Sequence, residues 1–160
     1  MPRPSLWKPL AGATAVALLT GWIGRLLTDL GPWYYGLSFP PWKPPDWLFG
    51  PAWTTIYVLA VASFVSVWRN GPEERRPAVL GLFAINIVFH LLWSALFFTW
   101  KRPDLALVEV AFLWLSILAP VLAFWRWWRP AALMLLPYLA WVTFASALNA
   151  SIVMRNGPFG

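Results

Sequence analysis

The chain has 160 residues, of which 60% are hydrophobic and 11% are charged, and its formal net charge is +6. Since a soluble domain usually has about 25% charged residues, this composition excludes an ordinary water-soluble surface and predicts an integral membrane protein. The sequence has no cysteine, which excludes disulfides, zinc–thiolate sites, iron–sulfur clusters and a cysteine nucleophile, and the single histidine excludes a polyhistidine metal centre.

Five apolar runs follow one another, and each is long enough, at about 1.5 Å per residue, to cross a hydrocarbon core of about 30 Å. The first run follows a short basic flank without a convincing signal-peptidase site, so we expect it to be retained. Pro120 and Pro137 lie inside two of the runs and are expected to kink their helices. The sequence therefore predicts a single domain over residues 1–160, an all-α integral membrane bundle of five transmembrane helices at about 9–27, 51–68, 79–100, 105–125 and 131–154.

The connection between the first two runs, Thr28 to Gly50, is much longer than the other three. Connections of more than about 12–15 residues without regular structure are usually functional or disordered. This one contains Trp33, Trp42 and Trp47 and is too aromatic for a disordered segment. We therefore expect a long structured first loop that acts as a lid over one end of the bundle.

The basic residues stand singly or in pairs at the ends of the apolar runs, which is typical of membrane topology signals and not of nucleic-acid binding. The N-terminal side of the membrane has the larger set: Arg3, Lys8, Arg69, Arg75, Arg76, Arg126 and Arg129. The other side has Lys43, Lys101, Arg102 and Arg155. The positive-inside rule then predicts a cytoplasmic N-terminus and an external first loop.

Helical spacing places polar and aromatic residues from three runs at one depth, between the middle of the membrane and the first loop. They are Trp53 and Tyr57 in the second run, Asn86, His90 and Trp93 in the third, and Trp141, Ala145 and Leu148 in the fifth. A small-molecule site is usually an apolar pocket with a few polar groups. We therefore expect a cavity that has Asn86 and His90 as its floor and the aromatic residues as its walls.

Packing is the alternative explanation for several of these residues. Trp93 and Trp141 suit core packing as well as ligand binding, and the choice between the two stays open. For His90 we favour a hydrogen bond between helices over a metal or haem ligand. The tryptophans at the ends of the runs are explained by the membrane interface alone; these are Trp7, Trp68, Trp100, Trp125, Trp127 and Trp128.

Two further features have structural explanations. Ala13, Ala17 and Gly21 recur every four residues and permit close helix packing, within one chain or between two chains. Glu109, near the start of the fourth run, is expected to stabilise that helix terminus or to pair with the basic residues just before the run, with a proton relay as the alternative. The sequence contains no nucleophile–base pair, paired carboxylates or phosphate loop, so it indicates no catalytic and no metal site.

The first loop and the runs after it contain several motifs in a fixed order. They are Trp33-Tyr34, Leu37, Pro40-Pro41-Trp42-Lys43-Pro44-Pro45-Asp46-Trp47, Pro51-Ala52-Trp53-Thr54-Thr55-Ile56-Tyr57, Trp93-Ser94-Ala95-Leu96-Phe97-Phe98, and Pro137-Tyr138-Leu139-Ala140-Trp141 with Phe144-Ala145 and Leu148-Asn149. In residue type, order and spacing, the stretch from about 33 to 156 resembles the TspO/MBR family, the tryptophan-rich sensory proteins and mitochondrial translocator proteins.

This resemblance implies a five-helix membrane bundle, commonly a homodimer, with a ligand cavity beneath the first loop. The family binds porphyrins such as protoporphyrin IX and haem, and isoquinoline-type drugs, and its animal members bind cholesterol. Trp53 and Trp141 match the two tryptophans that are implicated in light-dependent porphyrin breakdown by some bacterial members. The family's cavity positions match Trp33, Tyr34, Pro44, Trp53, Tyr57, Trp93, Trp141 and Ala145.

The chain departs from the family pattern at two places. The family's third helix usually has Gln and then Asn four residues later, and here these positions are Asn86 and His90. A titratable ring therefore replaces an amide. Tyr138 has no Lys or Arg shortly after it, so the cholesterol-recognition pattern of animal members, itself a weak predictor, gives no support for sterol binding.

Three functional hypotheses follow. The first is a membrane sensor, carrier or scavenger that binds porphyrin or haem as its ligand and requires no cofactor. It is expected to lie in a bacterial cell membrane and to form a homodimer through small-residue helix faces. The second is a light-dependent porphyrin-degrading enzyme that uses Trp53 and Trp141. The third is a structural or partner-binding membrane protein without a small ligand. The candidate ligand-binding residues are Trp33, Tyr34, Pro44, Trp53, Tyr57, Asn86, His90, Trp93, Trp141, Ala145 and Leu148.

Overall fold

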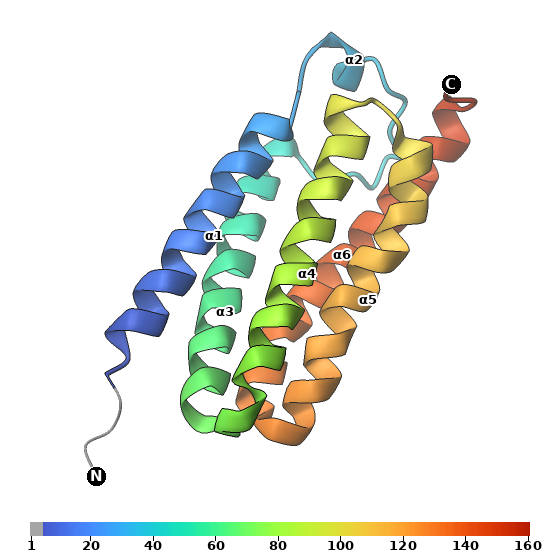
Figure 1. Cartoon of the computed structure of the whole chain (residues 1–160). Helices are drawn as coiled ribbons and strands as arrows, with labels where there is room; N and C mark the ends of the chain where they lie inside the picture. Colours follow the sequence, from blue (N-terminus) through green and yellow to red (C-terminus); the bar gives the residue numbers. More distant parts are fainter. Residues whose placement is uncertain (1–4) are drawn as a thin grey trace.

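The computed structural model describes residues 5–160, and within this range the chain is helical and contains no strand. All five long helices are long and apolar enough to cross a membrane, which confirms the predicted fold class. Arg3, which contributes to the predicted topology, lies outside the described residues. The long helices run side by side in alternating directions (Figure 1) and are α1 (Trp7–Leu27), α3 (Phe49–Asn70), α4 (Arg76–Ser94), α5 (Pro103–Trp127) and α6 (Arg129–Asn156).

Most of these helices extend slightly beyond the predicted bounds, because flanking polar and aromatic residues continue the helix after the apolar run has ended. The third run is the exception. Its helix α4 ends at Ser94 and continues as a π-helical turn, η3 (Ala95–Thr99). Pro120 and Pro137 lie inside α5 and α6, and each helix continues through its proline.

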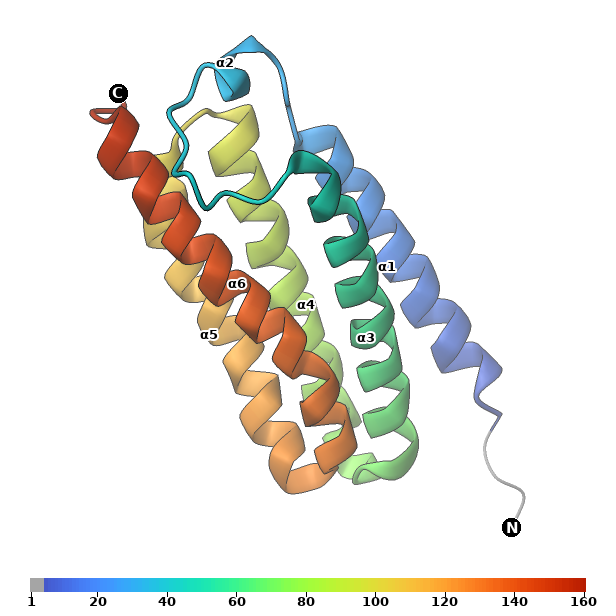
Figure 2. The same cartoon turned by 180° about the vertical axis from the view of Figure 1, so that it is seen from behind.

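The helices form a ring in which α1 contacts α3, α3 contacts α6, α6 contacts α5, α5 contacts α4, and α4 contacts α1. Helix α5 buries a continuous stripe of side chains against its neighbours, from Pro103 to Phe124. Helix α1 lies at the edge of the bundle, as Figures 1 and 2 show, and Thr20 is its one buried residue. The outer surface is apolar, with exposed side chains such as Leu18 and Val108, as expected for contact with lipid.

The loop between α1 and α3 crosses one end of the bundle, which we call the lid end (Figure 1). It contains the short helices α2 (Pro32–Tyr35) and η1 (Asp46–Leu48). The Asn156 side chain at the end of α6 fixes the loop, because its Oδ1 accepts from the Ser38 N–H at 2.7 Å and its Nδ2 donates to the Ser38 carbonyl at 3.0 Å. The opposite end, where α1 begins, carries the turn η2 (Glu73–Arg75), and we call it the N-terminal end.

Candidate functional site

A polar and aromatic contact joins α3 to α4 near the middle of the bundle. The Tyr57 hydroxyl and His90 Nε2 are 2.8 Å apart and share a hydrogen bond. The Trp53 ring, one turn before Tyr57, lies 4.7 Å from the His90 ring and 6.0 Å from the Tyr138 ring, measured between centroids. Sequence spacing places Trp53 above Tyr57, and the structure adds Tyr138 from α6 to the same group.

Asn86 lies one turn below His90 on α4, on the side away from the lid. Its amide donates to the Ser116 hydroxyl of α5 at 2.9 Å, and that hydroxyl donates to the Leu113 carbonyl at 2.6 Å. Asn86 therefore links α4 to α5, whereas His90 links α4 to α3. The two polar residues of the predicted floor hold three helices together at neighbouring levels.

The predicted tryptophans nearer the lid pack against phenylalanines. Trp93 stacks on Phe97 at 5.1 Å with an interplanar angle of 24°, and Trp33 from the loop meets the edge of Phe97 at 6.2 Å. On α6, Trp141 lies 5.7 Å from Phe49, the first residue of α3. Phe97 and Phe49 thus join the helix tryptophans to the lid. The four-residue spacing of Trp93 and Phe97 is a sequence signal for their contact. No spacing pattern links Phe49 to Trp141.

Tyr34 holds the lid over this aromatic cluster. Its side chain is buried, its hydroxyl donates to Asp46 Oδ1 at 3.1 Å, and Lys43 forms an ion pair with the same carboxylate. Burial, followed by the nearby Asp46 charge, raises the pKa of Tyr34 above its ordinary value. Pro44 is half-buried beside this group. The lid is therefore held by a neutral phenol and a paired carboxylate.

The remaining predicted residues lie on α6. Leu148 is buried and belongs to an apolar cluster with Tyr34 and Phe97, so it lies directly beneath the lid. Ala145 is half-buried, one turn before Leu148. Most of the predicted residues therefore gather between mid-bundle and the lid, where the side chains pack closely against one another.

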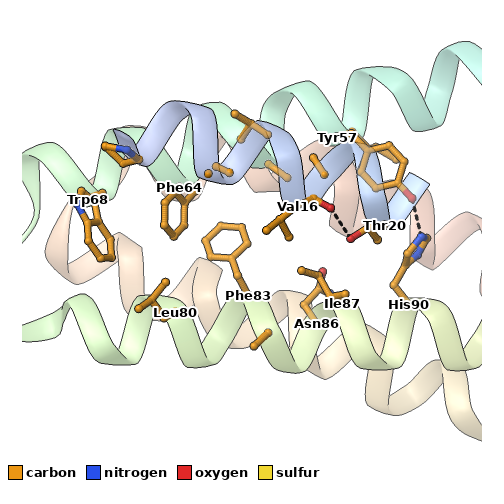
Figure 3. Close-up of a pocket in the computed structure, with 18 of the residues that line it drawn as sticks. Val16, Thr20, Tyr57, Phe64, Trp68, Leu80, Phe83, Asn86, Ile87 and His90 are labelled. Carbon is orange, nitrogen blue, oxygen red and sulfur yellow. Dashed lines mark hydrogen bonds between the residues drawn. The ribbon is translucent and has the colours of Figure 1, made fainter. Parts of the chain in front are cut away.

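A cavity of about 700 Å³ opens from this region toward the N-terminal end, between α1, α3 and α4. Tyr57, Asn86 and His90 line one end of it (Figure 3), and the other eight predicted residues are not among its lining residues. A second hollow, of about 640 Å³, lies between α1 and α3, and Trp53 and Tyr57 contribute to its wall. Sequence spacing along single helices did not predict either space, because both depend on the separation of α1 from its neighbours.

Two buried polar groups near the site have no hydrogen-bond partner within residues 5–160. They are His90 Nδ1 and the carboxylate of Glu109, of which both oxygens are unpaired. Glu109 was expected to stabilise a helix terminus or to pair with the basic residues before α5. Instead it is buried in the bundle, and Asp104 pairs with Arg102. The described part of the chain has no cluster of three or more His, Cys, Asp or Glu side chains that could hold a metal ion.

Comparisons with known proteins agree with the motifs. A sequence model of the TspO/MBR family matches residues 13–155. The chain is 40% identical to the tryptophan-rich protein TspO of Chlorobaculum tepidum over 150 residues, which cover 92% of this chain and 95% of the relative. It is 36% identical to the tryptophan-rich protein TspO of Archaeoglobus fulgidus, with coverage of 95% and 99%. It is also 33% identical to the translocator protein of Bos taurus, with coverage of 94% and 91%.

Proposed function

Since the chain belongs to the TspO/MBR family of membrane proteins, we propose that it binds a tetrapyrrole, porphyrin or haem, between mid-bundle and the lid, and acts as a sensor, carrier or scavenger of that ligand. The contact of Trp53 with His90 is the observation that carries the proposal, because it places an indole beside a polar ring inside the bundle. The Tyr57 hydroxyl shares a hydrogen bond with Nε2 of that ring. A planar aromatic macrocycle is the ligand class that such a surface suits.

The chemistry of the site supports a flat, amphipathic ligand. The indoles of Trp33, Trp53, Trp93 and Trp141 offer stacking surfaces, and offset aromatic stacking adds about 0.5–1.5 kcal/mol to the burial of apolar area. The aromatic cluster must open by side-chain rotation to admit the ring, because its members now contact one another. The carboxylates of the ligand would meet the cations of the lid end. Two of these, Lys43 and Arg102, pair with Asp46 and Asp104 in the structure. They would exchange these carboxylates for those of the ligand.

Topology and assembly form part of the same proposal. The excess of Lys and Arg at the N-terminal end supports a cytoplasmic N-terminus and an external lid in a bacterial cell membrane. We also propose a homodimer. Gly21 of the predicted small-residue stripe faces Tyr57 of its own chain, so we expect small residues on another helix face to form the dimer contact.

A titration with protoporphyrin IX in the dark tests the proposal. We expect a saturable shift of the Soret absorption band and saturable quenching of tryptophan fluorescence. Trp53→Phe and Trp141→Phe are each expected to weaken binding about two- to tenfold, the loss of one stacked indole. The matched control is Trp125→Phe, which changes an exposed tryptophan and should leave the affinity unchanged. Equal affinity in all three variants would remove the site from this part of the bundle.

Illumination of the same samples separates binding from chemistry. If the protein only binds porphyrin, the Soret band of the complex bleaches in light no faster than that of free porphyrin in detergent. Faster bleaching that requires Trp53 and Trp141 would instead indicate the light-dependent enzyme. A chain without any saturable porphyrin effect would be the structural or partner-binding protein.

A further inference from the structure

The cavity between α1, α3 and α4 extends along the bundle from the N-terminal end to the middle, and we call it the α1/α3/α4 groove. Lys8 and Trp68 line it at the N-terminal end, and Tyr57 and His90 line it at the other. Figure 3 shows Phe83, Leu80 and other apolar side chains of the wall between these ends. The volume of about 700 Å³ is large enough for a small organic molecule or a lipid chain.

The glycines of α1 explain the shape of the groove. A Cβ atom placed at Gly21 would lie 3.5 Å from the Tyr57 ring, and one at Gly24 would lie 3.9 Å from His90 Nε2. At Gly12, three turns earlier, a Cβ atom would meet nothing within 4 Å. On the side of the groove, helix α1 therefore approaches Tyr57 and His90 at Gly21 and Gly24 and leaves open space at Gly12. The groove is a wedge that is closed at mid-bundle by Tyr57 and His90.

The length of the groove matches one leaflet of a bilayer. From Lys8 to Thr20, which both line it, the helix rises about 18 Å. Half of a hydrocarbon core of about 30 Å is about 15 Å. At the closed end the Tyr57 hydroxyl bonds to His90 Nε2 and the Asn86 amide donates to Ser116, and His90 Nδ1 is the one buried polar side-chain atom of these three residues without a partner. The rest of the wall offers apolar contacts to an occupant.

Positive charge lies at the open end of the groove. Lys8 lines it, and no carboxylate forms a salt bridge with Lys8 within residues 5–160. The Arg76 guanidinium lies over the Trp68 ring at 5.1 Å and pairs with Glu73, whose side chain is largely exposed. The open end therefore offers one unpaired cation and one cation that shares its charge with a solvated carboxylate.

We propose that the α1/α3/α4 groove binds one acyl chain of an anionic phospholipid from the surrounding leaflet. The phosphate group lies at Lys8 and Arg76, and the terminal methyl group points toward Tyr57 and His90. This lipid site is independent of the tetrapyrrole, which is proposed to bind on the lid side of the same two residues. A second copy of the chain is a poorer occupant, because in a symmetric dimer through this face the two sets of basic residues would oppose each other.

Photo-crosslinking in lipid nanodiscs tests the proposal on the full-length chain. The probe is phosphatidylglycerol with a diazirine in its acyl chain, and phosphatidylcholine with the same chain is the neutral comparison. After illumination, mass spectrometry of peptides maps the adducts. We expect adducts of the anionic probe on α1 and α4 near Val16, Phe83 and Ile87, all of which line the groove, with fewer from the neutral probe.

Two variants define the occupant. Gly12→Phe fills open space in the groove, so the fold is retained while adducts at Phe83 and Ile87 are lost. Lys8→Gln lowers labelling by the anionic probe about fivefold, the contribution of one basic residue near an anionic headgroup. Arg126→Gln, an exposed cation of α5, is the matched control and should leave the labelling unchanged.

Three outcomes would overturn the proposal. The first is equal labelling by the two headgroups, and the second is adducts spread evenly over every lipid-facing helix and unchanged by Gly12→Phe. The third is protein–protein cross-links through the α1 face with little lipid labelling there, which would identify a second copy as the occupant.

Discussion

Tyr57 and His90 face each other across the gap between α3 and α4 and share a hydrogen bond of 2.8 Å. They form the boundary between two regions of the bundle, the aromatic cluster on the lid side and the α1/α3/α4 groove on the N-terminal side. One ring nitrogen of His90 is engaged in this hydrogen bond, and the residue is buried. Its first role is therefore to link α3 to α4.

His90→Asn tests whether the histidine also coordinates haem iron. Asparagine restores the amide that is usual in the family and still offers a hydrogen-bond partner to Tyr57. We expect the Soret and charge-transfer bands of the haem complex to stay unchanged, since the Tyr57 contact occupies Nε2. A change in the spin state of the iron, measured by the same absorption spectrum, would show instead that Nδ1 is an iron ligand.

Gly24 tests the close approach of α1 to the Tyr57–His90 pair. A Cβ atom there would lie 3.9 Å from both the Tyr57 hydroxyl and His90 Nε2, an ordinary contact distance. Gly24→Ala should therefore fold with unchanged thermal stability, whereas Gly24→Leu should lose about 1–3 kcal/mol through overpacking. Gly12→Leu, at the open end of the same helix, is the control and should be tolerated. Equal loss in the two leucine variants would contradict the wedge shape of the groove.

The sequence predicts the spans and the lid well, because hydropathy and loop length are local signals. The depth argument also works for Trp53, Tyr57 and His90, because residues three or four positions apart share a helix face whatever the neighbours do. It does not predict the groove, since the separation of α1 from α3 and α4 is a tertiary property. The small residues Ala13 and Ala17 indicate close packing by their spacing, yet in the structure they line this open groove.

Glu109 shows a second reason for a difference between sequence and structure. Its position near the start of α5 suggests an electrostatic contact at the helix terminus, and charge alone cannot show which face of the helix it occupies. The helix places it on the same buried stripe as Ser116, two turns away, and Arg102 pairs with Asp104 instead. Sequence spacing indicates the depth of Glu109 along α5, but it does not indicate whether that face of the helix is buried.

Asn156→Ala is expected to loosen the lid. The change removes both hydrogen bonds to Ser38 and leaves the other lid contacts in place. We expect the backbone amides around Ser38 to exchange hydrogen faster, and dissociation of protoporphyrin IX to speed up, while the thermal stability of the bundle falls by about 1 kcal/mol or less. Arg155→Ala, the neighbouring exposed residue, serves as the control. Unchanged exchange at Ser38 would argue against this anchor.

Tyr34 gives the lid a dependence on alkaline pH. Its pKa is raised in the folded state by burial and by Asp46, and the ordinary value for tyrosine is about 10. The folded state therefore binds this proton more tightly than the unfolded state does, so the stabilisation is complete below about pH 10 and is lost as the pH rises above it. The melting temperature should fall as the pH rises above about 10, and less steeply in Tyr34→Phe. Tyr35→Phe, which changes the exposed neighbour, should keep the slope of the unmodified chain.

The location of the bound porphyrin is the most direct test of the proposed function. Manganese(III) protoporphyrin is paramagnetic and broadens the indole N–H resonances of nearby tryptophans, so a two-dimensional NMR spectrum reports the position of the ring. The account predicts selective broadening of Trp33, Trp53, Trp93 and Trp141, while Trp68, Trp125 and Trp127 at the N-terminal end stay sharp. Broadening that is strongest at Trp68, or equal for all the tryptophans, would contradict a site beneath the lid.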